Sequence, residues 1–342
     1  MYITTDGKTH LYITIPSNAP SYARTLELKF SINGSGSVAV DYGDGSTTVI
    51  VTTPSVFLSH DYVDTGDYII TLTVNNGTVI FSSNIFDINN NANANRRSWL
   101  TRVEIGSGVT SIEANAFSSC QFLQRVTIPS SVTSFGSSAF NSCYLLQSIT
   151  IPSSITSIGL GTFSSCHSLQ SVMIPSSVTS ISSSAFSSCH SLQSITIPSS
   201  VTSFGSSAFT NCYSLQNITI PSSVTSIGSG TFLSDHALRA IHFKPTTPPT
   251  VDSSSAWTDL QTSCKIFIPF SASINYLTAT NYPSTSTYTY IGYATYVDGA
   301  SLPSQDSSQR CNVKWYPTVL DAVNQTNQIT TGNGNEIYCR YV

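Results

Sequence analysis

The sequence predicts a mainly β protein with an N-terminal β-sandwich, a solenoid of stacked coils and a small C-terminal β cap. The chain has 342 residues, of which 9% are charged and 40% hydrophobic, with 17 Tyr and 16 Phe. Such a composition buries a large core and is not that of a disordered chain. One long segment repeats at a fixed interval of 23 residues, the mark of a solenoid. The flanking segments instead alternate apolar and polar residues over short stretches, as β-strands do.

Residues 1–82 predict the β-sandwich. Apolar and polar residues alternate over 26–30, 38–40 and 68–74, and Gly-containing turns separate these stretches at 33–34, 43–45 and 76–77. Alternation with period two places one side of each strand against a core.

Two motifs in this region resemble the PKD domain, an immunoglobulin-like module. Residues 40–45 read V-D-Y-G-D-G and residues 60–68 read H-D-Y-V-D-T-G-D-Y. These match the family patterns D-x-G-D-G and H-x-Y-x-x-x-G-x-Y, although Val40 stands where Trp is usual. The resemblance implies a spacer or a surface-binding unit.

The acidic residues of the same motifs allow a calcium hypothesis. Hard cations prefer clustered oxygen ligands, and the candidates are Asp41, Asp44, Asp61 and Asp64. Asp also suits tight turns without any metal. The turn interpretation is the simpler one, and we expect no metal.

After a linker over 83–99 that is rich in Asn, residues 100–243 carry the repeat. One unit reads L-Q-S-I-T-I-P-S-S-V-T-S-I-G-S-S-A-F-S-S-C, and six copies fill 100–237 before a seventh strand. The columns kept at intervals of 23 include Phe117, Phe140, Phe163, Phe186, Phe209 and Phe232, then Leu123 to Leu238, Pro129 to Pro221 and Cys120 to Cys212.

Within each unit the pattern predicts a strand, a return path that runs back along the other side of the coil, and a Phe side chain that fills the coil's interior. Ile195 and Ile197 alternate with polar residues, and Pro198 ends the strand because it cannot donate to the ladder. Val201 and Phe204 point inward on the return path, and Phe209 fills the coil. One coil alone cannot shield these side chains, so stability comes from stacking neighbours.

This unit resembles the BspA-type leucine-rich repeat, whose pattern is L-x-x-I-x-I-P-x-x-V-x-x-I-x-x-x-A-F-x-x-C. The resemblance covers residues 100–243. It implies a right-handed solenoid with a parallel sheet on one face. It also implies a surface protein of a bacterium, protist or phage that adheres to proteins, cells or glycans.

If the isoleucines point inward, the residues between them form an outward strand face. Between Arg125 and Asp235 the sequence has no Asp, Glu, Lys or Arg, so this face can hydrogen-bond sugars or polar proteins but cannot steer charged ones. The alternative is a solvated strand that keeps the protein soluble. The predicted binding residues are Gln124, Thr127, Gln147, Thr150, Gln170, Met173, Gln193, Thr196, Gln216 and Thr219.

A second exposed column directly follows the cysteines. Its aromatic members could stack on sugar rings or pack on a partner protein, or they are loop residues without a role. The column consists of Gln121, Tyr144, His167, His190, Tyr213 and His236.

The cysteines of the repeat predict buried free thiols. Zinc sites cluster cysteines within one loop, whereas these occur once per coil, and parallel side chains fit the torsion of a disulfide poorly. Outside the repeat, Cys311 and Cys339 could form a disulfide in an oxidising environment.

Beyond the repeat we expect a C-terminal cap over 244–292. Residues 265–269 and 271–280 resemble the terminal strand and short helix that close many of these solenoids, and a cap is needed to cover the last coil. The tail over 293–342, with apolar stretches at 313–316 and 337–339, predicts a small separate β unit.

The sequence favours a binding protein over an enzyme. It contains none of the common motifs of hydrolases, metalloproteases or nucleotide-binding enzymes, and we expect no cofactor. A net charge of −4 argues against nucleic acid as a partner, and no apolar run is long enough for membrane insertion.

The predicted partner is a host or cell-surface protein or glycan. The N-terminus lacks the pattern of a secretory signal, which favours a phage virion component, as decoration, fibre or tail, in contact with other virion proteins. The alternatives are an exported bacterial or protist adhesin and a purely structural spacer. The expected location is therefore the virion surface or the cell surface.

Overall fold

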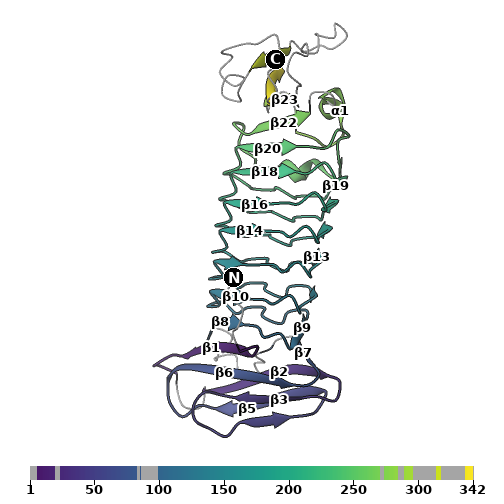
Figure 1. Cartoon of the computed structure of the whole chain (residues 1–342). Helices are drawn as coiled ribbons and strands as arrows, with labels where there is room; N and C mark the ends of the chain where they lie inside the picture. The colour runs from purple at the N-terminus through teal and green to yellow at the C-terminus, as the bar shows by residue number, and fades with distance from the viewer. Residues whose placement is uncertain are drawn as a thin grey trace.

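The computed structural model describes residues 6–19, 24–82, 85, 99–269, 273–283, 289–295, 313–316 and 336–341. They form a column of stacked coils with a broader two-sheet region at its N-terminal end (Figure 1). The solenoid has about seven turns and almost no helix.

Each coil contributes one strand to a front sheet and one strand of equal or smaller length to a back sheet. The front strands are β8 (Leu100–Glu104), β10 (Arg125–Thr127), β12 (Ser148–Ile149), β14 (Ser171–Met173), β16 (Ser194–Thr196), β18 (Asn217–Ile220), β20 (Ala240–Phe243) and β22 (Lys265–Pro269). The back strands are β9 (Val109–Ile112), β11 (Ser134–Phe135), β13 (Ser157–Ile158), β15 (Ser180–Ile181), β17 (Ser203–Phe204), β19 (Ser226–Ile227) and β21 (Thr250–Val251).

Successive coils pair in parallel at the register of the repeat, with the strand ladder interrupted between β16 and β18 in front and between β11 and β13 at the back. Ser171 lies opposite Ser194 in the front sheet, and Ser180 lies opposite Ser203 in the back sheet, 23 residues apart in each case. Between the sheets the loops are also bonded, since Phe163 N–H donates to Ala185 O at 2.9 Å. The prediction of a parallel solenoid is therefore confirmed.

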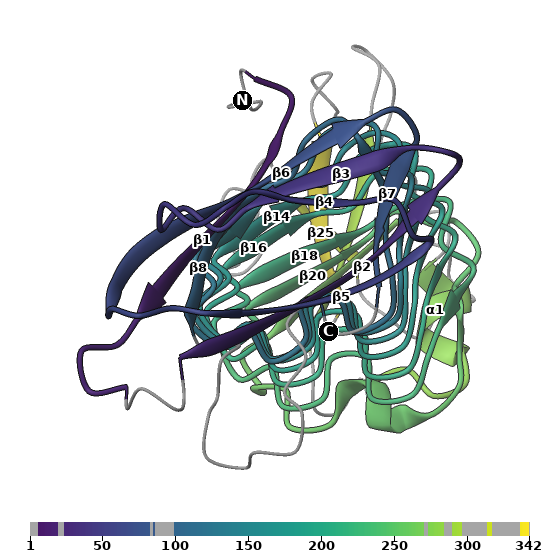
Figure 2. The same cartoon turned by 90° about the horizontal axis from the view of Figure 1, so that it is seen from below.

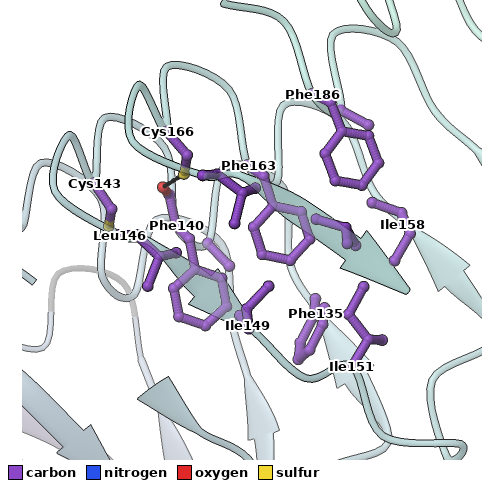
Figure 3. Close-up of a cluster of buried hydrophobic side chains, with 14 of the residues drawn as sticks. Phe135, Phe140, Cys143, Leu146, Ile149, Ile151, Ile158, Phe163, Cys166 and Phe186 are labelled. Carbon is purple, nitrogen blue, oxygen red and sulfur yellow. Dashed lines mark hydrogen bonds between the residues drawn. The ribbon is translucent and has the colours of Figure 1, made fainter. Parts of the chain in front are cut away.

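The interior is a stack of aromatic rings. Phe117, Phe140, Phe163, Phe186, Phe209 and Phe232 are fully buried, and neighbouring centroids lie between 5.4 and 5.8 Å apart. Leu, Ile and Cys side chains from the two sheets and loops fill the space around them (Figure 3). Trp257 continues the stack, 5.5 Å from Phe232.

At the N-terminal end, seven strands are divided between two sheets. They are β1 (Thr9–Ile15), β2 (Thr25–Asn33), β3 (Ser37–Asp41), β4 (Val49–Val51), β5 (Ser55–Asp61), β6 (Gly66–Asn75) and β7 (Thr78–Phe81). Strands β1, β6, β3 and β4 form one group, and β7, β2 and β5 form the other. Leu28, Val38 and Leu72 are among the residues buried between them.

Both groups continue into the solenoid. Strand β1 pairs antiparallel with β8, the first front strand, and β7 pairs in parallel with β9, the first back strand. The sequence predicted a sandwich over 1–82 and a linker over 83–99, whereas hydrogen-bonded sheets join the two regions here. Seen along the column, the N-terminal strands lie across the end of the coils (Figure 2). Since the first coil has strand partners on both sheets, its core is covered.

At the other end the strand and helix of the predicted cap are present as β22 and α1 (Ser273–Thr278), after a short 3-10 helix, η3 (Ser254–Trp257). The front sheet then extends through β23 (Thr289–Thr295), β25 (Glu336–Tyr341) and β24 (Val313–Tyr316). Lys265 lies opposite Thr289 in a parallel pair. The described strands of the tail are thus hydrogen-bonded to the front sheet.

Candidate functional site

The outward strand face lies on the front sheet, where the sequence placed it. Backbone bonds between successive Gln residues keep one column straight, since Gln170 N–H donates to Gln147 O and Gln193 N–H to Gln170 O. The strand register does the same for the neighbouring column, in which Met173 lies opposite Thr196. All ten predicted residues have exposed or half-buried side chains, and Met173 is 75% exposed.

This face presents hydroxyl and amide groups without charge. From β12 to β18 the coils contain no Asp, Glu, Lys or Arg. Because each side chain projects from a hydrogen-bonded strand, the groups recur at the strand spacing of about 4.8 Å. The arrangement can exchange hydrogen bonds with hydroxyl-rich or amide-rich surfaces and has little capacity to order a charged one.

The aromatic column forms a continuous stack. Ring centroids lie 4.6 Å apart for Tyr144 and His167, 4.3 Å for His167 and His190, and 4.7 Å for His190 and Tyr213. His236 adds a fifth ring 5.8 Å from Tyr213, and Gln121 is not aromatic.

Stacking limits what this column can contact. The faces of His167 and His190 are covered by neighbouring rings, so ring edges are available to a partner and inner ring faces are not. Partial burial and the neighbouring His190 lower the pKa of His167, which favours its neutral form. The sequence suggested that this column stacks on sugar rings or packs on a partner protein. The geometry allows a partner to pack on the ring edges, but a sugar cannot stack on the inner rings.

The candidate calcium residues are held as turn residues. Asp41 Oδ1 accepts the N–H of Gly43 at 2.9 Å, and Asp44 Oδ1 accepts the N–H of Ser46 at 3.0 Å. Asp44 Oδ2 pairs with His60 Nε2 at 2.7 Å. Although burial opposes the shift, the bonds from Ser46 and His60 lower the pKa of Asp44 to about 2.

These carboxylates do not converge on a common point. Asp61 and Asp64 are exposed, and within the described residues no three acidic, His or Cys side chains form a group suited to a metal ion. His60 instead stacks on Tyr42 at 3.9 Å.

The cysteines of the repeat are buried free thiols. Cys166 Sγ donates to Phe140 O at 3.3 Å, and the same contact recurs in neighbouring coils. Burial raises the pKa of Cys166 well above its usual value and that of Cys189 to about 12. Thiols in this state are poor nucleophiles and poor metal ligands. Cys311 and the side chain of Cys339 lie outside the described residues. The disulfide predicted between them therefore also lies outside the described part of the chain.

The structure also shows a hollow that sequence reasoning missed. Two adjoining depressions of about 220 and 330 Å³ lie where the N-terminal strands meet the front sheet. They share Arg102, Arg125 and Ser148, and Tyr12 forms part of the second. The spacing of 23 residues between the two arginines was the signal available in the sequence. The approach of Tyr12 had no such signal.

Among the described residues, no helix combines the length and apolar character needed to cross a membrane.

A family model for the BspA type leucine-rich repeat region, present in six copies, matches residues 64–190 and 161–273. No curated protein matches the chain.

Several solved structures are similar to part of the chain. A leucine-rich cell surface protein from Faecalibacterium prausnitzii A2-165 is 35% identical, with a TM-score of 0.45, over 53% of this chain and 46% of that protein. The leucine-rich repeat protein of T. pallidum is 28% identical, with a TM-score of 0.41, over 44% of this chain and 79% of its own. The chain thus spans less than half the length of the Faecalibacterium protein.

Proposed function

Because the chain belongs to the BspA type leucine-rich repeat family, we propose that it is a non-enzymatic cell-surface protein for recognition or adhesion. In this proposal the solenoid is a rigid scaffold, and the outward strand face of the front sheet is the contact surface. The partner is a surface protein or glycan that offers hydroxyl and amide groups.

The observation that carries the proposal is the uncharged, ordered front face. The side chains of Gln147, Gln170 and Gln193 are exposed, and their backbones are bonded in register. Because the strands already hold these side chains at regular positions, binding orders side chains but no backbone, which limits the loss of conformational entropy. The interior of the described coils, in contrast, consists mainly of buried thiols, aliphatic side chains and aromatic rings.

The family match supports a cell surface as the location. It gives no support to a phage virion, which the N-terminal sequence favoured.

The test places charge on two opposite faces of one coil. Thr196 lies on β16 in the front sheet and Ser203 on β17 in the back sheet. We expect a Gln193→Glu/Thr196→Glu double variant of the full chain to lose attachment in a cell-binding assay and a glycan array, because carboxylates need hydration that the contact would remove. The Ser203→Glu control, which adds one carboxylate to the back sheet, should attach like the parent protein.

Circular dichroism and thermal unfolding are the controls that check whether both variants keep the fold. Equal attachment of the front-face variant and the parent protein would rule out this face as the contact surface. Equal loss in both variants would show that the effect is not specific to the face.

A further inference from the structure

The hollow at the start of the front sheet contains two arginines in adjacent strands. Arg102 on β8 lies directly opposite Arg125 on β10, and both side chains point outward. Like charges that face each other across a sheet are destabilising. Later coils have Ser148, Ser171 and Ser194 at this position, so the repeat itself does not need arginine there.

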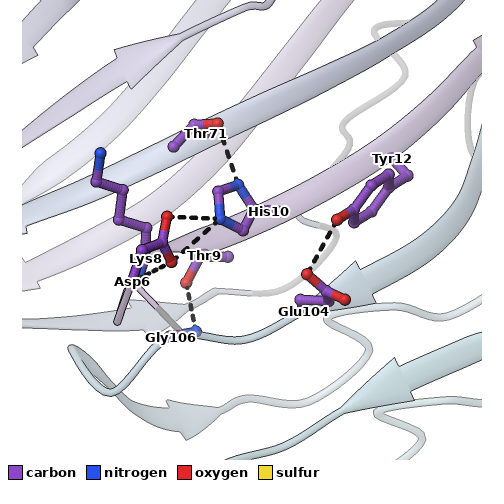
Figure 4. Close-up of polar contacts among 8 residues, drawn as sticks. All are labelled: Asp6, Lys8, Thr9, His10, Tyr12, Thr71, Glu104 and Gly106. Atoms are coloured by element: carbon purple, nitrogen blue, oxygen red, sulfur yellow. Dashed lines mark hydrogen bonds and ion pairs between the residues drawn. The ribbon is translucent and has the colours of Figure 1, made fainter. Parts of the chain in front are cut away.

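Arg102 is held in place by two neighbours. Its guanidinium pairs with Glu104 and lies over the ring of Tyr12, 4.9 Å from the centroid. Tyr12 in turn donates to Glu104 Oε2 at 2.9 Å (Figure 4). The Nε atom of Arg102 is buried and has no acceptor among the described residues. Glu104 therefore fixes the guanidinium, and because Nε is buried, a ligand can meet only the terminal nitrogens of this partly exposed side chain.

Arg125 has no such restraint. Its side chain is exposed, and the described residues include no carboxylate paired with it. Arg102, Arg125 and Glu104 together carry a charge of about +1, which one monoanion would balance. Two further acids lie on or next to the N-terminal strands beside Tyr12: Asp6, which pairs with His10 at 3.1 Å, and Asp67, which accepts a hydrogen bond from Thr14 at 2.6 Å.

The rest of the hollow is uncharged. Gln124, Gln147 and Ser148 line the larger depression, and Thr127 and Thr150 line the smaller one together with the apolar Val126 and Ile128. Their hydroxyl and amide groups match those of a sugar ring, and the arginine fork matches a carboxylate. Since the following coils have no charge until Asp235, an acidic ligand has no competing cation along this face.

We propose that this hollow binds the carboxylate of an acidic saccharide, a uronic acid, with Arg125 as the principal contact and Arg102 as a fixed second donor. The inference rests on the proposed function and names the ligand class at one end of the same face. The neutral part of the saccharide then extends over the Gln and Thr side chains.

The test uses calorimetric titration of the full chain with a glucuronate-containing tetrasaccharide of hyaluronan. Its neutral counterpart has the carboxylates reduced to primary alcohols. Arg125→Ser restores the residue of the later coils, and Arg239→Gln restores the Gln column at the far end of the face. Both variants remove one positive charge from an exposed position and agree with the repeat, so both should fold.

We expect Arg125→Ser to weaken binding of the acidic tetrasaccharide at least about tenfold, which corresponds to ~1.4 kcal/mol. Arg239→Gln should leave it unchanged, and the neutral tetrasaccharide should bind weakly and equally to all three proteins. Added salt should weaken the acidic interaction only.

Several results would overturn the proposal. They are no binding of the acidic tetrasaccharide, equal binding by the parent protein and Arg125→Ser, or equal loss in both variants. Tighter binding of a sulfated tetrasaccharide without uronate would reject the carboxylate assignment. If Arg125→Ser still attaches to cells while the Gln193→Glu/Thr196→Glu variant does not, this inference fails and the proposed function stands. If both variants still attach to cells, both this inference and the proposed function are rejected.

Discussion

The carboxyl group of Asp235 accepts a hydrogen bond from the backbone N–H of Cys212, with 2.8 Å between Oδ1 and N. Asp235 occupies the place that five preceding coils give to cysteine, and its side chain is fully buried. Its second oxygen, Oδ2, has no partner among the described residues. In the coil before, Cys212 Sγ donates to Phe186 O. By the same register a protonated Asp235 would donate to Phe209 O.

This position predicts a pH-dependent stability. Burial raises the pKa of Asp235 well above its usual 3.8. The unfolded chain therefore releases the proton first, and the free energy of unfolding falls as pH rises above about 3.8 until the folded-state pKa is reached. Each pH unit in this window lowers it by ~1.4 kcal/mol.

Asp235→Cys, which restores the residue of the repeat, should remove this contribution. Urea unfolding at pH 4 and pH 7 gives the comparison, and the variant should gain stability over the parent protein at pH 7 but not at pH 4. The same difference between the two proteins at both pH values would contradict a neutral buried carboxyl.

The aromatic stack predicts a large cost for removing one inner ring. Phe186 lies 5.4 Å from Phe163 and 5.7 Å from Phe209, all fully buried. Phe186→Ala should lower the free energy of unfolding by ~3–5 kcal/mol, because the coils on either side cannot close the cavity. Chemical denaturation measures this loss.

The outer stack provides the control. Tyr213 is 43% exposed, so Tyr213→Ala should cost only ~1 kcal/mol, the value of an aromatic pair with little burial. Similar losses for the two variants would mean that the inner rings do not hold the coils together.

Left-handed backbone residues recur in every coil and predict the effect of glycine. Ser184 has φ of 55°, and the same position is glycine in two other coils, Gly161 and Gly230. Ser184→Gly should raise the free energy of unfolding by ~0.5 kcal/mol, because relief of the left-handed conformation exceeds the entropic cost of glycine. Thermal unfolding measures the shift.

Ser187 is the matched control, since it lies in the same loop and is not among the residues with positive φ. Ser187→Gly should lower stability by ~0.5–1 kcal/mol. Changes of the same sign in both variants would show that the conformation of Ser184 carries no strain.

The contacts of a residue could be predicted from the sequence where the repeat determines which residues are its neighbours. The inward Phe and Leu columns and the outward Gln and Thr columns follow from the interval of 23, because equal coils put equivalent residues in contact. Trp257 escaped prediction since it lies 25 residues after Phe232, outside that interval, yet it occupies the next place in the stack. The stacking of Tyr144 and His167 depended on side-chain rotation, which the interval does not set.

The sequence by itself determined the solenoid, its core and its uncharged face, because these need only contacts between residues one coil apart. The tertiary structure alone decided how the ends are joined and what gathers there. Strand β1 pairs with β8, which brings Tyr12 under Arg102, 90 residues later in the chain. No local pattern specifies such a contact, since it arises only when hydrogen-bonded sheet edges from distant segments meet.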